Sequence, residues 1–361
     1  MGLTVELGAR SYPLEMGALS ELGGKLAAVT APGPCVLVSN EVVGPLYARA
    51  ALTSLEQAGF QASLEIIPDG EVNKTLATWQ DLVHRLLALG VDRKTPVISL
   101  GGGVTGDIVG FAAASTMRGV PFVQVPTTLL AMVDASVGGK TGVNTERGKN
   151  LVGAFYQPIL VHAALDTLGT LEPAELRCGL GEVLKHAVLE GEGFLGWLES
   201  KAAELVGRDP DALAHAVARC CAYKADIVRR DEREGGLRAI LNCGHTLGHA
   251  LERELGYGRL RHGEAVAVGM VAEAHMAVAM GLAEAGFPER IEALCVALGL
   301  PLRSPDSVPA QALVQATQHD KKRARGILTA ALPCAPGKVS LTAVTPAELL
   351  IGARAVLPLE V

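Results

Sequence analysis

Short apolar runs alternate with amphipathic helical patterns over the first 130 or so residues of the chain. This alternation limits the fold most strongly, because strands separated by helices pair in parallel and are covered on both faces. We therefore predict an α/β fold with a doubly wound parallel sheet. The expected elements are a short N-terminal strand, a turn at Tyr12-Pro13, strands Cys35–Ser39, Ala62–Ile67, Pro96–Leu100 and Phe122–Val125, and helices Leu19–Ala28, Pro45–Ala58 and Leu76–Leu89.

Polar and glycine-rich residues follow these runs. They are Asn40, the stretch Asp69–Lys74, the stretch Gly101–Asp107 and the pair Thr127–Thr128. In an open parallel sheet, ligands bind beyond the carboxyl ends of the strands. The sequence GGGVTGD at Gly101–Asp107 would let backbone N–H groups approach a pyrophosphate where the next helix begins. A plain tight turn between strand and helix is the alternative.

The stretch Val137–Gly142 is superficially similar to a phosphate-binding P-loop. It lacks the GxxxxGK[ST] spacing, because no glycine stands at the first required position. We therefore exclude an NTPase.

Helical periodicity dominates after about residue 175 and predicts a mostly α-helical second half. A chain of 361 residues has room for about two domains, and we place them at 1–175 and 176–361. The expected helices are Ala174–Leu189, Phe194–Leu205, Asp211–Arg230, Ile240–Leu255, Gly263–Met280, Pro288–Leu298 and Pro309–His319, and the few strand-like runs are Gly326–Leu332 and Lys338–Leu341.

Three of the nine histidines fall in the stretch Leu241–Gly269. His245 and His249 are four residues apart and share one face of a helix, and His262 follows a loop later. Two such imidazoles, a third nearby and a carboxylate from elsewhere would form a divalent-metal site. Paired histidines on a helix are also common on surfaces and in cores.

Further polar clusters flank these histidines. Glu182, Lys185 and His186 share one helical face, so Glu182 is a candidate carboxylate ligand, although an ion pair with Lys185 explains it equally well. Arg238 and Asn242 lie four apart and face the same way as the histidine pair. The charged runs Tyr223–Glu234 and Asp320–Arg323 are candidates as well, but such runs are also typical of solvated helix ends.

Composition excludes several classes of protein. A net charge of −6 and 4% aromatic residues argue against nucleic-acid binding. No apolar run is long enough to span a bilayer, and the N-terminus lacks the pattern of a signal peptide. Seven cysteines without regular spacing indicate reduced thiols, and we expect a cytoplasmic protein.

Taken together, the motifs resemble those of one family. The chain contains, in order, GGGVTGD, MRG, PTTLLAMVDASVGGKTGVN, GKN, GEVLKHA, DERE with GLR, LNCGHTLGHALE, RHGEAVAVGM and DKK. This series is similar to that of the 3-dehydroquinate synthases, which belong to the sugar phosphate cyclases. The resemblance extends over nearly the whole chain.

The resemblance implies a Rossmann-like N-terminal domain that holds NAD and an α-helical C-terminal domain that holds a divalent metal, zinc or alternatively cobalt. It implies a carbon–oxygen lyase of the shikimate pathway that converts 3-deoxy-D-arabino-heptulosonate 7-phosphate to 3-dehydroquinate and phosphate. The family's route is transient oxidation by NAD, β-elimination of phosphate, re-reduction and intramolecular aldol closure. The implied partners are this phosphorylated sugar acid and a second subunit in a homodimer.

The resemblance also implies roles for individual residues. The metal ligands would be Glu182, His245 and His262, and His249 would lie at the catalytic site without binding the metal. Residues near NAD would be Asp69, Gly70, Glu71, Lys74, Gly102, Gly103, Val104, Thr105, Gly106, Asp107, Thr127, Thr128, Asp134, Lys140, Lys149, Thr167 and Thr170. Residues near the substrate would be Lys140, Asn150, Lys185, Lys224, Arg238, Asn242, His249 and Lys321, with Arg118 reaching the substrate phosphate of the neighbouring subunit.

Small departures and three alternatives accompany this interpretation. Ala135 stands where many members carry serine, Asn40 where some carry aspartate, and Lys322 fits the motif as well as Lys321. The alternatives are another sugar phosphate cyclase, a metal-dependent polyol dehydrogenase of the same fold, and a non-enzymatic NAD-binding module. A dehydrogenase would accumulate NADH and would not need Arg118, Lys149, Lys224 and Arg238.

Overall fold

The chain divides into two units, each with its own core. The computed structural model describes residues 2–256, 258–317, 323–324 and 327–358. The first unit comprises Met1–Leu171 and Lys224–Arg233, and the second comprises Glu172–Tyr223 and Glu234–Val361.

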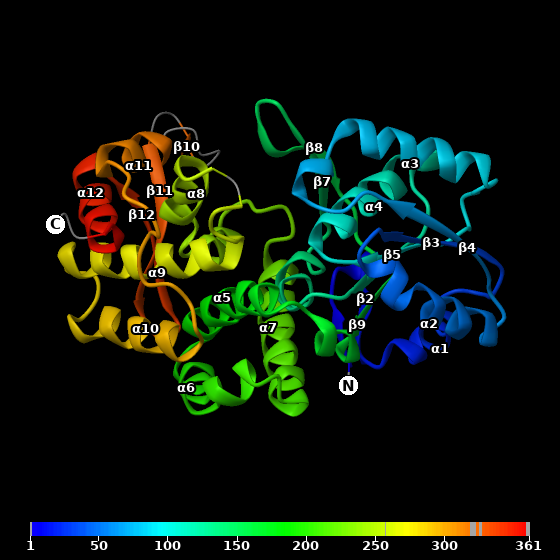
Figure 1. Cartoon of the computed structure of the whole chain (residues 1–361), viewed down its shortest axis with the longest axis horizontal. Helices are drawn as coiled ribbons and strands as arrows, with labels where there is room; N and C mark the ends of the chain where they lie inside the picture. Colours follow the sequence, from blue (N-terminus) through cyan, green and yellow to red (C-terminus); the bar gives the residue numbers. More distant parts are fainter. Residues whose placement is uncertain (1, 257, 318–322, 325–326, 359–361) are drawn as a thin grey trace. The chain divides into compact units, whose positions relative to one another are not determined.

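A seven-stranded sheet forms the centre of the first unit (Figure 1). Its strand order is β1-β2-β9-β6-β5-β3-β4, and every neighbouring pair is parallel except β1 with β2. The predicted doubly wound α/β fold is confirmed. The strands are β1 (Gly2–Val5), β2 (Tyr12–Gly17), β3 (Pro34–Asn40), β4 (Gln61–Ile67), β5 (Val97–Gly101), β6 (Phe122–Pro126) and β9 (Leu160–Ala164).

Alternating side chains of the central strands form a separate core on each face of the sheet. On one face, Leu37 and Ile98 pack with residues of α1 (Leu22–Ala27) and α2 (Val43–Gln57). The other face is covered by α3 (Leu76–Ala88) and α4 (Gly103–Ser115), which pack on neighbouring residues of the same strands (Figure 1). Because both faces are buried, these strands are apolar at successive positions.

The sheet reverses its winding direction between β3 and β5. The chain runs outward from β3 to β4, crosses back to β5, and then continues in the opposite direction to β6. At such a switch point the loops after the two neighbouring strands leave on opposite sides and open a crevice at the carboxyl ends. The residues that follow β3 and β5 are therefore placed where a ligand would bind.

Some expected elements of the first unit were wrong or missing. Tyr12 and Pro13 begin strand β2 instead of a turn, and the expected helix Leu19–Ala28 is a 3-10 turn followed by the shorter α1. The hairpin of β7 (Lys140–Thr145) and β8 (Gly148–Phe155) was not expected, and neither was strand β9.

Helix α9 (His262–Ala279) is the centre of the second unit. It is apolar around most of its circumference, as is typical of a buried helix, and α5, α8, α10 and α12 pack against it (Figure 1). No described helix combines the length and apolar character needed to cross a bilayer. The remaining elements of the second unit are α5 (Pro173–Glu190), α6 (Glu192–Val206), α8 (His245–Glu254), α10 (Gly286–Ala297), α11 (Ala310–Ala316), α12 (Pro346–Val356), β10 (Arg323–Ala324), β11 (Ile327–Ala335) and β12 (Lys338–Val344). Helix α7 (Pro210–Arg230) begins in this unit, and its part from Lys224 on belongs to the first.

The expected helix Ile240–Leu255 was wrong in its first turn. Leu237–Asn242 is a 3-10 segment, and Gly244 adopts a left-handed conformation with φ 79° before α8 begins at His245. A Cβ on Gly244 would lie 2.6 Å from both Met270 Cγ and the Val266 carbonyl oxygen. The break therefore lets the start of α8 lie directly against α9.

Candidate active site

Polar side chains from three strand ends meet at the switch point of the first unit. Asn40, at the end of β3, donates from Nδ2 to Asp69 Oδ1 at 2.7 Å and to Thr105 Oγ1 at 3.1 Å. Asp69 follows β4, and Thr105 lies in the first turn of α4, which follows β5. The prediction that these polar residues share one edge of the sheet agrees with this geometry.

The glycine-rich turn connects β5 to α4. Gly102 is the residue before α4, and no side chain caps the helix. The first N–H groups of a helix lack partners within the helix, so this terminus suits an anion. A Cβ on Gly102 would lie 3.3 Å from Thr128 Cγ2, and one on Gly103 would lie 3.2 Å from Ala135 Cβ. The glycines therefore also allow the threonine pair and Ala135 to lie close to the turn.

A partly buried ion pair joins α4 to the segment before α3. Lys74 Nζ lies 2.5 Å from Asp107 Oδ2. Burial raises the pKa of the Asp107 carboxyl, and the Lys74 ammonium opposes that shift. Glu71, three residues before Lys74, accepts a hydrogen bond from Asn144 Nδ2 at 2.7 Å. These contacts hold the stretch Asp69–Lys74 against α4 and the hairpin.

The threonines expected near NAD form a linked group. Thr167 donates from Oγ1 to the Thr127 carbonyl at 3.2 Å, and the Thr170 and Tyr47 hydroxyls lie 2.5 Å apart. Thr128 Oγ1 accepts from the backbone N–H of Ala131 at 3.2 Å. Thr127 Oγ1 is buried and has no hydrogen-bond partner among the described residues. Buried hydroxyl groups normally have a hydrogen-bond partner. A ligand bound at this strand end could supply the partner of Thr127 Oγ1.

Lys224 begins the segment Lys224–Arg233, which belongs to the first unit although the residues on both sides of this segment belong to the second. Its Nζ lies 2.7 Å from Asp134 Oδ1 and 2.6 Å from the Asp134 carbonyl oxygen. Asp134 lies in a π-helical turn, Ala131–Ala135, a conformation that is common at functional sites.

The remaining expected residues of this unit lie on the hairpin and after α4. Lys140 and Asn150 are exposed, Lys149 is half-buried, and Asn150 has a positive φ of 53°. Its backbone N–H donates to Asn144 Oδ1 at 2.9 Å. Arg118 is exposed in a turn where Met117, Arg118 and Gly119 all have positive φ.

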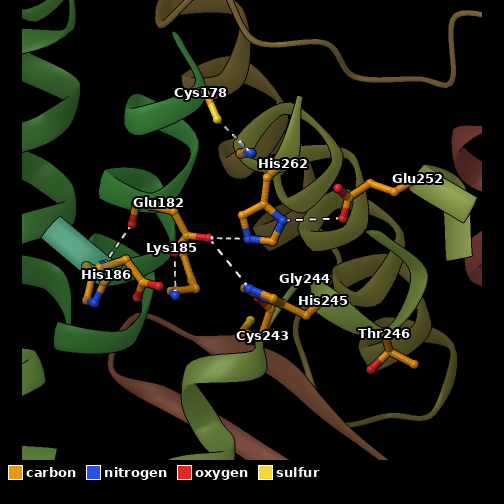
Figure 2. A network of polar contacts seen from close by, with 12 residues as sticks. Cys178, Glu182, Lys185, His186, Cys243, Gly244, His245, Thr246, Glu252 and His262 are labelled. Atoms are coloured by element: carbon orange, nitrogen blue, oxygen red, sulfur yellow. Dashed lines mark hydrogen bonds and ion pairs between the residues drawn. The ribbon is translucent and has the colours of Figure 1, made fainter. Parts of the chain in front are cut away.

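The second unit brings His245 and His262 close to Glu182 (Figure 2), and His249 lies in the same group of histidines. Candidate ligand atoms of His245, His249 and His262 lie within 4.8 Å of one another. Glu182 Oε1, from α5, lies 3.6 Å from His245 Nε2 and 3.5 Å from His262 Nε2. The carboxylate is fully buried. One carboxylate oxygen and imidazole nitrogens in one cluster are a donor set that divalent zinc and cobalt accept.

His245 and His262 turn Nε2 toward Glu182, and the other ring nitrogen of each, Nδ1, also has a partner. His245 Nδ1 lies 3.0 Å from the Cys243 carbonyl oxygen, and His262 Nδ1 lies 3.3 Å from Glu252 Oε2. Because a carbonyl oxygen only accepts, His245 carries its proton on Nδ1 and turns Nε2 toward Glu182. Burial alone would lower the pKa of His262, but the Glu182 and Glu252 carboxylates raise it to about 10. The cluster therefore favours a positive charge at its centre.

Glycines allow the helices that carry these ligands to touch. A Cβ on Gly263 would lie 1.7 Å from the Cys178 carbonyl oxygen, and one on Gly181 would lie 2.1 Å from the Gly263 carbonyl oxygen. Gly181 precedes Glu182, and Gly263 follows His262. The backbones of α5 and α9 therefore meet at the positions next to the two candidate ligands.

Two buried cationic side chains and a half-buried amide lie in the same unit. Lys185 forms an ion pair with Glu182 (Figure 2) and is 1% exposed. Arg238 is 2% exposed, and Asn242 donates from Nδ2 to Glu234 Oε1 at 3.2 Å. Lys321 and Lys322 lie outside the described residues.

Two polar residues of this site were not predicted from the sequence. Glu252 could have been found, because His245, His249 and Glu252 follow the i, i+4, i+7 spacing of a single helix face. Glu273, which contacts the backbone at the start of α8, is 28 residues from His245 and gives no local signal.

Comparisons with known proteins identify the family. Residues 64–178 match the family described as 3-dehydroquinate synthase N-terminal, and residues 179–323 match the one described as 3-dehydroquinate synthase C-terminal. The chain belongs to the 3-dehydroquinate synthase family. The 3-dehydroquinate synthase of Citrifermentans bemidjiense is 51% identical over 330 residues, which are 90% of this chain and 91% of that protein.

Solved structures of sugar phosphate cyclases are similar along almost the whole chain. A 2-deoxy-scyllo-inosose synthase complexed with carbaglucose-6-phosphate, NAD+ and Co2+ has a TM-score of 0.90 and 26% identity, and the match covers 98% of this chain and 99% of that chain. A 2-epi-5-epi-valiolone synthase from Streptomyces hygroscopicus with NAD+ and Zn2+ bound has a TM-score of 0.86 and 29% identity over 96% of each chain. The resemblance to the 3-dehydroquinate synthase family and the fold it implied are confirmed.

Proposed function

We propose that this chain converts 3-deoxy-D-arabino-heptulosonate 7-phosphate to 3-dehydroquinate and phosphate, and that it is a carbon–oxygen lyase dependent on NAD and a divalent metal. The observation that carries the proposal is the cluster of Glu182, His245 and His262 in a chain that is 51% identical to a 3-dehydroquinate synthase. When bound, NAD supplies reversible hydride uptake, and the metal supplies Lewis acidity toward vicinal hydroxyl groups.

For the metal we propose Glu182, His245 and His262 as the ligands. Their three donor atoms face one another within one unit, and three protein ligands leave further positions open, as catalytic zinc sites do. The solved cyclases contain Co2+ or Zn2+, which supports zinc, with cobalt as the alternative. His249 shares the cluster, and we assign it to the substrate.

For NAD we propose the carboxyl edge of the sheet in the first unit. The start of α4 offers N–H groups to the pyrophosphate, and the buried Thr127 hydroxyl offers a polar contact. The proposed set is Asp69, Gly70, Glu71, Lys74, Gly102, Gly103, Val104, Thr105, Gly106, Asp107, Thr127, Thr128, Asp134, Lys140, Lys149, Thr167 and Thr170.

For the substrate we propose cationic and amide side chains that match its carboxylate and phosphate. Buried Lys185 and Arg238 can neutralise an anion at low dielectric, where each charge pair is stronger than in water. Lys224 is fixed by Asp134, which directs its ammonium group. The proposed set is Lys140, Asn150, Lys185, Lys224, Arg238, Asn242, His249 and, outside the described residues, Lys321.

We also propose a cytoplasmic homodimer in which Arg118 contacts the substrate phosphate of the neighbouring subunit. The exposed Arg118 lies in a turn of three successive positive-φ residues, a strained conformation of the kind that functional sites retain. All seven cysteines are buried and free, which is consistent with a reducing compartment.

A different sugar phosphate cyclase is the second candidate, because the 2-deoxy-scyllo-inosose synthase has a TM-score of 0.90. The two candidates differ in substrate charge, since a phosphorylated aldohexose lacks the carboxylate of the heptulosonate. The protein is incubated with NAD and zinc and with each substrate separately, and the products are identified by mass spectrometry. We expect 3-dehydroquinate from the heptulosonate and no cyclised product from the hexose phosphate; the reverse result would establish the second candidate.

A further inference from the structure

Glu273 is a fully buried carboxylate in α9 that contacts the backbone where α8 begins. Its Oε2 accepts from the Gly244 N–H at 2.6 Å, and its Oε1 accepts from the Thr246 N–H at 2.9 Å and the Leu247 N–H at 3.4 Å. We propose that Glu273 is a positioning residue, which fixes the orientation and basicity of His245 through the backbone. This inference rests on the proposed metal site.

The contact passes through one peptide group. The Gly244 N–H that Glu273 binds and the Cys243 carbonyl that His245 Nδ1 binds belong to the same planar peptide unit. Glu273 thus holds the plane in the orientation in which its carbonyl can accept from the imidazole. A carboxylate on the N–H side also polarises the carbonyl, which strengthens the bond to Nδ1 and makes Nε2 a better donor to a metal.

The start of α8 has no cap of its own. Its N-cap residue is Gly244, which carries no side chain, so the first N–H groups of the helix need acceptors from elsewhere. Glu273 supplies both carboxylate oxygens from α9. The two glycines Gly244 and Gly269 make this reach possible, because a Cβ on Gly269 would lie 1.9 Å from the Gly244 carbonyl oxygen.

The charge of Glu273 also matters for a cation bound nearby. His245 is the first residue of α8, and the positive end of a helix dipole disfavours a cation at that place. The buried carboxylate at the same terminus opposes this effect. The start of α9 at His262 is capped by a residue of its own first turn, since Glu264 accepts from the Arg261 N–H at 3.0 Å. Each helix start that carries a proposed histidine ligand therefore has a glutamate cap.

The test compares Glu273→Gln with Glu348→Gln in the full-length protein. Glu348 caps α12 in the same unit through the Thr345 N–H at 2.6 Å, so its substitution removes a helix-capping carboxylate away from the histidines. Zinc affinity is measured by chelator competition, and the absorption spectrum of the Co2+-loaded protein reports ligand geometry. We expect zinc to bind Glu273→Gln about 10- to 100-fold more weakly with a changed Co2+ spectrum, and Glu348→Gln to keep both properties.

Circular dichroism confirms that each variant is folded. If Glu273→Gln does not fold, the comparison is made with Glu273→Asp, which keeps the charge and withdraws it by one methylene, and weaker zinc binding is again expected. Unchanged zinc affinity and an unchanged Co2+ spectrum in a folded variant would overturn the positioning role. If the wild-type protein itself bound no zinc at the cluster, the proposed metal site would fail instead.

Discussion

In the histidine cluster, the partner of Nδ1 determines which ring nitrogen of each imidazole faces Glu182. His245 and His262 can turn Nε2 toward Glu182 because their Nδ1 atoms are held by the Cys243 carbonyl and the Glu252 carboxylate. The spacing of the histidines predicted which side chains gather, whereas the tautomer of each ring depends on contacts that the spacing does not contain. A residue that never touches a metal can therefore control its affinity.

The Glu252→Gln variant tests this at His262. The amide keeps the size of the side chain but removes the charge that holds Nδ1–H, so we expect zinc to bind about 10- to 100-fold more weakly. The matched control is Glu292→Gln, which removes a carboxylate 2.9 Å from His275 Nε2, a histidine that lies outside the cluster. Equal losses of zinc affinity in the two variants would contradict a specific role for Glu252.

The buried His162 should make the stability of the first unit depend on pH. Burial lowers the pKa of this fully buried imidazole, and its hydrogen bond to the Ala18 carbonyl at 2.9 Å only partly opposes the shift. The unfolded chain therefore takes up the proton first, so this stabilisation is complete above about pH 6.5 and is lost as the pH falls toward the folded-state pKa.

Thermal unfolding at about pH 7.5 and about pH 5.5 measures this effect. We expect the melting temperature to fall less between these values in His162→Gln than in the wild type, because glutamine does not titrate. The control is His84→Gln, an exposed residue of α3, which should keep the wild-type difference. An unchanged pH dependence in His162→Gln would show that the imidazole does not contribute.

At the scale of elements, periodicity predicted strands β3 to β6 and most helices well, because buried strands and amphipathic helices have distinct patterns. It missed the short, buried strand β9. It failed where glycine and polar residues carry the structure. The hairpin β7–β8, with the sequences KTGVNT and GKNLVGAF, lacks a clear alternation, and the start of α8 depends on the left-handed Gly244. Close backbone contacts between helices, as at Gly263, are also invisible to periodicity.

Gly263→Ala tests the contact between α5 and α9. The added Cβ would lie 1.7 Å from the Cys178 carbonyl oxygen, so the two helices must separate, and we expect a loss of about 3 kcal/mol in the free energy of unfolding. Gly196→Ala is the matched control, because its Cβ would have no neighbour closer than 3.7 Å in α6. That variant should gain about 0.5 to 1 kcal/mol. Denaturant unfolding of the metal-free protein measures both values, and similar stabilities would contradict the close packing.

At the scale of the whole chain, the family motifs predicted the fold and the candidate site residues, and the comparisons confirm the family. The pattern could not show that Lys224–Arg233 belongs to the first unit, because helix α7 runs through Tyr223 and Lys224 without a break in periodicity. Glu273 was missed for a related reason. Its partners are backbone N–H groups in a distant segment, and backbone groups look alike in every sequence.

The most direct measurement of the proposed reaction follows phosphate release and NADH absorbance in the same sample. The protein is supplied with 3-deoxy-D-arabino-heptulosonate 7-phosphate, zinc and a catalytic amount of NAD. We predict that phosphate is released far beyond the amount of NAD present while no NADH accumulates, because the hydride returns within each turnover. NADH that rises in step with product would contradict this account and indicate a dehydrogenase, and an absence of phosphate release would exclude this substrate.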